Sequence, residues 1–189
     1  MTLETLPAVA AEFRSVAERA SIVVLRVGRS HVIEQPAPTQ WSIAECLTHL
    51  TMVTEAYLPI WRDALVRARA EGLAGKPPFR LDLWGRFWVW FLEPPPKVRF
   101  PAPNRFVPLE VGTGDGVLDS FLQRQDQVLA LIGLAEGLAV DRIKIPSTFE
   151  HRVRYSVWSS FRANLSHQRR HLWQAERVAE QFHTVTSSD

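Results

Sequence analysis

Three histidines have the residue type and spacing of a metal site. His167 and His171 are four residues apart, so on a helix both imidazoles lie on one face. His49 lies far upstream, and on a facing helix it would add a third ligand. Three imidazoles that leave coordination positions open are typical of reactive metal centres. The sequence therefore predicts that His49, His167 and His171 bind a metal ion.

The segment that carries His49 has clear helix-start signals. Ser42 is followed three residues later by Glu45, which is the pattern of a capping box, and Trp41 and Cys46 have the positions of a hydrophobic staple. We expect this helix to run from Ser42 to about Ala70. Pro59 lies inside it and predicts a kink or a π-type irregularity, because proline lacks an amide proton.

Three further long helices are expected from apolar residues that recur every three or four positions. Between the second and third helices, the stretch from residue 72 to 114 contains eight of the 13 prolines and a run of aromatic residues. We expect it to be a long crossover with one short helix near residues 83–92. The expected long helices are Pro7–Gly28, a helix from the N-cap Asp115 to about residues 133–137, and a last helix from about Tyr155 to His183.

These elements predict an all-α protein, a four-helix bundle with a long Pro- and aromatic-rich crossover between helices 2 and 3. A chain of 189 residues is long enough for one domain with a sizeable core, and we expect a single domain over residues 1–189. On helical wheels, His49 lies at the rim of the apolar arc of its helix, and His167 and His171 lie at the rim of theirs. Packing the two arcs together would bring the three imidazoles to one edge of the core.

Two sequence blocks resemble the DinB-like (YfiT-like) four-helix proteins. The first is the W-S-x-x-E-x-L-x-H-L pattern at residues 41–50, and the second is the H-x-x-R-H-L-x-Q-x-E pattern at residues 167–176. The resemblance implies that the three histidines bind a divalent metal, zinc or nickel, with waters completing the shell. It also implies relatives that are thiol-dependent S-transferases or a mycothiol-dependent isomerase. This chain departs from a common family pattern, because Gln168 stands where a glutamate often follows the first histidine of the pair.

Other polar residues near the expected site each have a structural explanation beside a functional one. Glu45 could orient an imidazole, but the capping box already explains it. Cys46 lies inside an apolar arc and is expected to be a core thiol rather than a nucleophile. Asn164 could line a pocket or form a buried hydrogen bond.

Three tryptophans of the crossover have two interpretations. Core packing is the first, and we favour it because large aromatic side chains are usually well buried. The second is that these indoles roof an apolar substrate pocket above the metal. The residues are Trp84, Trp88 and Trp90.

Composition excludes several classes of partner. With 22 Lys and Arg against 20 Asp and Glu, the net charge is +2 and no basic stripe is present, so we expect no nucleic-acid partner. A single cysteine rules out an internal disulfide, and a cytoplasmic protein is expected. No apolar run is long enough to span a bilayer, so we expect no membrane partner. An exposed helix face would be compatible with a homodimer.

These observations lead to three hypotheses on function. The first is a divalent-metal-dependent thiol (S-)transferase that acts on small electrophiles, with a small-molecule substrate and a low-molecular-weight thiol as partners. A metal-dependent hydrolase would use the same ligands. The third is a non-catalytic, stress-associated bundle that binds a metal or another ligand. The sequence names no catalytic base for any of them.

Overall fold

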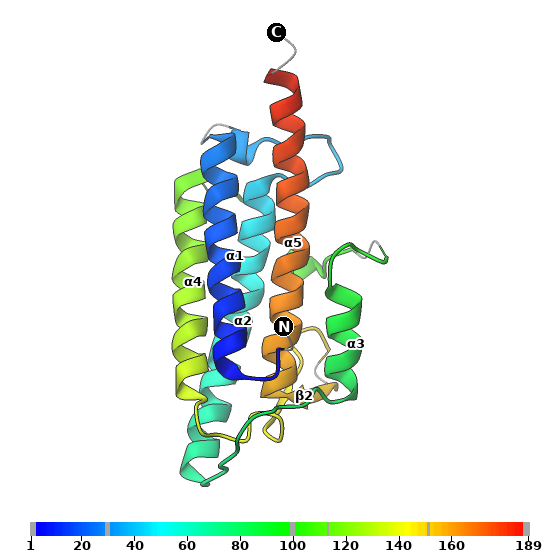
Figure 1. The fold of residues 1–189 in the computed structure, drawn as a ribbon. Coiled ribbons are helices and arrows are strands. Elements are labelled where there is room, and N and C mark those ends of the chain that lie inside the picture. Colours follow the sequence, from blue (N-terminus) through cyan, green and yellow to red (C-terminus); the bar gives the residue numbers. More distant parts are fainter. Residues whose placement is uncertain (1–2, 29–30, 99–100, 113, 151, 187–189) are drawn as a thin grey trace.

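The computed structural model describes residues 3–28, 31–98, 101–112, 114–150 and 152–186 (Figure 1). These residues form five α-helices, two short 3-10 helices and one two-stranded sheet. The α-helices are α1 (Leu6–Val27), α2 (Ile43–Ala70), α3 (Leu83–Leu92), α4 (Gly114–Leu134) and α5 (Val157–Thr186). The 3-10 helices are η1 (His31–Ile33) and η2 (Asn104–Phe106), and the strands are β1 (Lys144–Pro146) and β2 (Arg154–Ser156).

Local caps explain where the first two helices begin. The side chain of Thr5 accepts a hydrogen bond from the amide of Ala8 and starts α1. At α2 the expected capping box is present, with Ser42 and Glu45 each accepting a hydrogen bond from the other's amide. α2 is α-helical through Pro59, so the π-type irregularity expected within this helix is not found.

The four long helices lie side by side (Figure 1). α2 packs against α4 and α5, and α1 packs against the same two helices. The expected four-helix bundle is confirmed in part, because the described residues are mostly helical but include a fifth helix and a small sheet. The largest fully buried side chains of the core include Phe13, Trp61, Phe121, Trp158 and Phe161.

The short helix α3 lies beside α5, outside the row of long helices (Figure 1). The side chain of Asp82 caps it by accepting from the amide of Gly85. The other carboxylate oxygen of Asp82 accepts from Lys144 at 2.6 Å and from the amide of Ser156 at 2.6 Å. Gly85 itself is buried against Ser159 of α5. These contacts attach the N-terminal end of α3 to the bundle.

The sheet was not expected, and it corrects the start of the last helix. β1 and β2 pair antiparallel, with Ile145 opposite Tyr155. α5 begins at Val157 rather than near Tyr155, because Tyr155 is held in the strand, where its hydroxyl forms a hydrogen bond with that of Tyr57. The expected N-cap Asp115 lies within the first turn of α4, which begins at Gly114.

None of the described helices is both long enough and apolar enough to cross a membrane.

Candidate metal centre

The three predicted histidines converge between α2 and α5. Their candidate ligand atoms all lie within 4.8 Å of one another, and Nε2 of His49 is 3.2 Å from Nε2 of His167. His49 is 1% exposed, His167 is 7% exposed and His171 is partly buried. Only His171 keeps the rim position expected from the helical wheels. Phe106 of the crossover covers His49, and Phe149, from the chain before β2, covers His167.

Hydrogen bonds at the outer ring nitrogens orient two of the three imidazoles. The backbone oxygen of Phe106 can only accept, so Nδ1 of His49 must be the donor in their 2.7 Å contact. Nδ1 of His171 is 3.2 Å from the side-chain oxygen of Gln174 and donates to it. Each of these neutral rings therefore keeps its Nε2 lone pair for a metal ion.

The donor set fits a divalent transition metal. Zinc–imidazole bonds are about 2.0–2.1 Å long, which places two nitrogens of a tetrahedral site about 3.3 Å apart. The 3.2 Å between the Nε2 atoms of His49 and His167 is close to that value. Nδ1 of His167 is buried without a hydrogen-bond partner among the described residues. Three neutral imidazoles without a carboxylate in the cluster suit zinc or nickel better than magnesium or calcium.

Burial keeps all three imidazoles neutral. It lowers the pKa of His49, although the hydrogen bond to Phe106 opposes this shift. Burial lowers the pKa of His167 well below its ordinary value, and the neighbouring His171 and His49 add to the effect. Burial, with His49 and Arg170 nearby, lowers the pKa of His171 to about 3. Neutral imidazole is the form that binds a metal ion, so the folded chain holds its ligands ready near neutral pH.

The same pKa shifts predict that the metal-free protein loses stability in weak acid. The unfolded chain takes up a proton at each histidine below pH 6.5, whereas the folded chain does so only at lower pH. The chain therefore takes up protons when it unfolds between pH 6.5 and about pH 3. The free energy of unfolding falls as the pH falls through this range. By pH 5.5 we expect a loss of about 1 kcal/mol for each strongly shifted imidazole.

Denaturant unfolding of chelator-treated protein at pH 7.5 and 5.5 measures this loss, at pH values above the titration of ordinary carboxylates. The His167→Gln variant, which has one imidazole fewer in the cluster, should show a smaller difference between the two pH values. Equal stability of the unsubstituted chain at both pH values would contradict the assignment of neutral buried histidines.

Aromatic rings surround the three histidines. Trp41 stacks on His171 with ring centroids 5.6 Å apart and lies 5.0 Å from the ring of His49. On the other side, Phe149 contacts His167 at 6.2 Å. Trp88 of α3 lies 6.3 Å from Phe149 and so reaches the site through that ring. The three-histidine group is thus lined mainly by aromatic rings, which limit the access of water to it.

The crossover tryptophans have two different environments. Only Trp88 extends toward the histidines, and it is partly buried. Trp84 and Trp90 are 45% and 57% exposed, so core packing was the wrong interpretation for these two residues. Both lie on the face of α3 that points away from α5.

The other polar candidates have the structural roles that compete with catalysis. Glu45 is engaged with the amide of Ser42 at 2.7 Å and with the side chain of Gln35. Cys46 is fully buried, and burial raises the pKa of its thiol well above the ordinary value. Gln168 donates to Asn164 at 3.0 Å, and both side chains are buried between helices. None of the four belongs to the three-histidine group that could hold a metal ion.

Two groups that orient the histidines were missed by the sequence analysis. Gln174 is three residues after His171, and the helical spacing could have identified it as a partner of that imidazole. The carbonyl of Phe106 has no sequence signature, because any residue type supplies a backbone oxygen and the crossover has no regular period.

Arginines next to the ligands tie α5 to its surroundings. Arg169 forms ion pairs with Glu12 of α1 at 3.0 Å and with Glu93 at 2.7 Å. Arg170 donates to the backbone oxygens of Phe91 and Val98. The chain after α3 is therefore held to the segment of α5 that carries His167 and His171.

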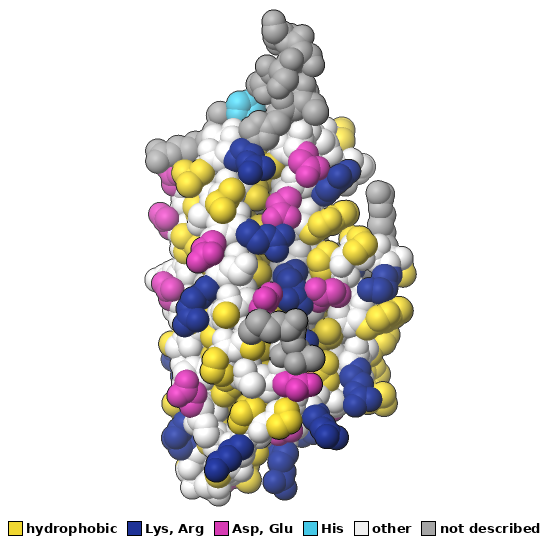
Figure 2. Space-filling view, viewed as in Figure 1, with side chains coloured by type: hydrophobic (Ala, Val, Ile, Leu, Met, Phe, Trp, Pro, Cys, Tyr) yellow, Lys and Arg dark blue, Asp and Glu magenta, His cyan; other side chains and the backbone are white. Residues whose placement is uncertain are grey.

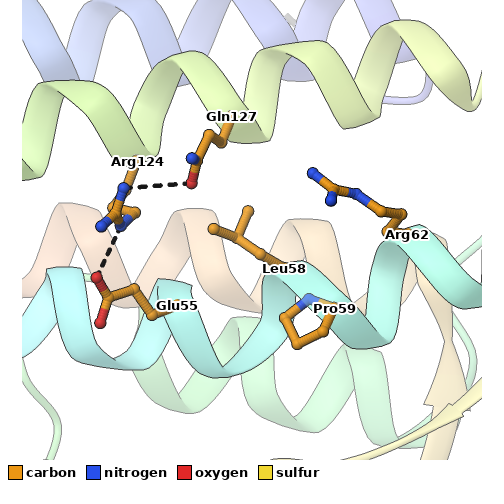
Figure 3. A pocket seen from close by; sticks show the side chains of 6 residues that line it. All are labelled: Glu55, Leu58, Pro59, Arg62, Arg124 and Gln127. Carbon is orange, nitrogen blue, oxygen red and sulfur yellow. Dashed lines mark hydrogen bonds and ion pairs between the residues drawn. The ribbon is translucent and has the colours of Figure 1, made fainter.

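A separate pocket of about 320 Å³ lies between α2 and α4 (Figure 3). Arg124 occupies one side and is bonded to Glu55 at 2.8 Å and to Gln127 at 3.4 Å (Figure 3). None of the three histidines lines this pocket, and Arg124 is already paired with the carboxylate of Glu55. The remaining lining residues are Leu58, Pro59 and Arg62.

Comparison with known proteins identifies the family of the chain. No curated protein and no solved structure gives a significant match. A profile of the DinB superfamily matches residues 5–175, a range that covers most of the chain and includes all three histidines. Two of its features agree with the structure: the mostly helical fold and a three-histidine group that could hold a metal ion. The chain therefore belongs to the DinB superfamily.

Proposed function

We propose that the protein is a divalent-metal-dependent enzyme that transfers a low-molecular-weight thiol to a small electrophile. The observation that carries the proposal is the convergence of three neutral imidazoles, two of which are oriented through their outer nitrogens. His49, His167 and His171 would hold zinc or nickel. Such a metal supplies Lewis-acid chemistry that lowers the pKa of a thiol into the neutral range.

Thiol transfer suits this site better than hydrolysis because the described cluster contains no carboxylate. Hydrolysis of an ester or amide usually needs a general base and an acid for the leaving group. Glu45 is occupied by its cap, and Gln168 cannot accept a proton at neutral pH. In a transfer, the thiol proton passes to solvent, the S–C bond forms, and the bond from the attacked carbon to its leaving group breaks, so that the leaving group takes the electron pair. With an epoxide the ring C–O bond breaks instead, and the oxygen takes up a proton from solvent.

The chain's own residues would provide orientation and exclusion of water. Phe106 and Gln174 keep the His49 and His171 rings turned with Nε2 toward the centre of the cluster. Trp41 and Phe149 cover the rings with apolar surface, which favours an electrophile with an apolar body. The same proposal takes residues 1–189 as a single domain, a four-helix bundle with a long crossover between helices 2 and 3. Its partner would be a small molecule.

Metal content and turnover test the proposal together. We expect purified protein to retain about one equivalent of zinc or nickel, and the reloaded protein to join small thiols to electrophiles such as aryl halides and epoxides. Esters and amides offered without thiol should not be cleaved. His31→Ala, which changes a histidine outside the cluster, should keep full activity.

Each outcome of this test has a separate meaning. Loss of activity in His167→Ala together with loss of metal would support the proposal. Cleavage of esters or amides at a comparable rate would replace it by the hydrolase. Stoichiometric metal without any turnover would favour a non-catalytic binding protein, and absence of stoichiometric metal would reject the metal site itself.

A further inference from the structure

The outer face of α3 is an exposed apolar surface. Leu83 is 80% exposed, Trp84 45%, Phe87 43% and Trp90 57%. Their positions bring the four side chains to one side of the helix, whereas Gly85 faces α5. We call these four residues the α3 ridge. Figure 2 shows hydrophobic side chains along the edge of the molecule where α3 lies, with basic side chains beside them.

The α3 ridge is unusual because of its residue types. Single exposed apolar residues are common, but aromatic rings gathered on one short helix mark a surface that binds something. With side chains of about 150–250 Å² each, the exposed fractions amount to about 350–550 Å² of apolar surface. The other face of α3 already provides its attachment to the bundle, so these rings are not needed to hold the helix.

Charges around the α3 ridge are positive on the outside. The carboxylates at the two ends of α3 each form an ion pair, Asp82 with Lys144 at 2.6 Å and Glu93 with Arg169 at 2.7 Å. Arg86 is exposed on α3 itself. Lys97 donates to the backbone oxygen of Trp90, and its ammonium lies 5.2 Å from the centre of the Trp90 ring. The ridge therefore combines exposed indoles with two exposed basic residues, Arg86 and Lys97.

We propose that the α3 ridge docks the protein on the surface of an anionic lipid membrane. Tryptophan is favoured at the boundary between lipid headgroups and acyl chains, and basic residues next to it are attracted to anionic headgroups. Short apolar helix faces with adjacent cations bind in this plane without crossing the bilayer. The absence of a spanning helix led to the expectation of no membrane partner, but peripheral docking needs no such helix.

A second copy of the chain is a poorer occupant of the same surface. A stable interface buries about 800 Å² on each partner, of which about 57% is apolar, so the polar and charged residues beside the α3 ridge would have to take part in the contact. A twofold contact through α3 would also bring Arg86 and Lys97 toward the same cations of the other copy, and like charges in an interface are unfavourable. An anionic surface removes this difficulty, because it has the opposite charge.

Vesicle sedimentation of the metal-loaded full chain tests the proposal. We expect binding to phosphatidylcholine vesicles that contain phosphatidylserine at a lipid concentration about thirtyfold lower than for phosphatidylcholine alone, from two cations near the surface. Added salt should weaken this preference. Replacing Arg86 and Lys97 together by glutamate should abolish the preference for anionic vesicles.

A matched pair of leucines separates the α3 ridge from general surface hydrophobicity. Leu25 of α1 and Leu83 of the ridge are both 80% exposed, so Leu83→Ser should weaken vesicle binding by several-fold while Leu25→Ser should leave it unchanged. Equal effects of the two substitutions would overturn the proposal, as would equal binding to neutral and anionic vesicles. So would a concentration-dependent dimer that Leu83→Ser dissociates in a protein that binds no vesicles, measured by sedimentation velocity.

Discussion

Replacing His167 by alanine is expected to lower the affinity for zinc or nickel by more than about 100-fold, since even residues that only orient a ligand contribute 10- to 100-fold. The three imidazole rings form a nearly equilateral triangle, in which the ring of His167 is 5.0 Å from that of His49 and 4.7 Å from that of His171, and the last two rings are 4.6 Å apart. Without it, the two remaining nitrogens cannot hold a three-coordinate site. His49→Ala should have a comparable effect for the same reason.

Metal-dependent thermal stability measures the change in affinity without relying on activity. A ligand that binds only the folded state raises the melting temperature, so adding zinc should stabilise the unsubstituted chain and His31→Ala but not His167→Ala. Competition with a chromogenic chelator gives the affinities directly. An unchanged stabilisation by zinc in His167→Ala would show that the ion binds elsewhere on the chain.

Gly85→Ala is expected to destabilise the protein by about 1–3 kcal/mol, although alanine is the better helix former. A Cβ atom at this position would lie 2.2 Å from Oγ and 2.4 Å from Cβ of Ser159. The hydroxyl of Ser159 also accepts from the amide of Asp82, so it cannot move without loosening the start of α3. The substitution therefore forces α3 away from α5.

Gly133 of α4 provides the matched control. It is also a helical glycine, but a Cβ there would meet no atom within 4 Å. Gly133→Ala should therefore stabilise the protein, by up to about 1 kcal/mol. Equilibrium denaturation of both variants measures whether each substitution raises or lowers the free energy of unfolding. Equal effects of the two substitutions would show that α3 does not depend on close contact at Gly85.

The sequence predicted the helices that carry the ligands well, because their signals are local. The capping box at Ser42 set the start of α2, and the four-residue spacing of His167 and His171 set one shared face. α3 was also expected over the residues where it is found. These features depend on contacts within a few residues along the chain, which a pattern can show.

The missed features depend on contacts between distant residues. Strands of three residues are too short to show an alternating pattern, so β1 and β2 could not be recognised. The depth of His49 depends on the crossover residue Phe106, which no periodicity relates to α2. Trp84 and Trp90 differ from Trp88 only in the face of α3 that they occupy, and that assignment requires knowing which side packs on α5.

His49 lies far from His167 and His171 in the sequence, and this separation bears on the order of folding and metal binding. His49 and His167 are 118 positions apart in the sequence, and the carbonyl that orients His49 comes from 57 positions downstream of it. Contacts of such long range form late in folding, because the intervening chain must be closed first. A chain in which α5 is not docked against α2 cannot bring His49 next to His167 and His171. If the three histidines bind a metal tightly, as proposed, binding has to follow the packing of the two helices, so metal uptake would report a completed fold rather than initiate it.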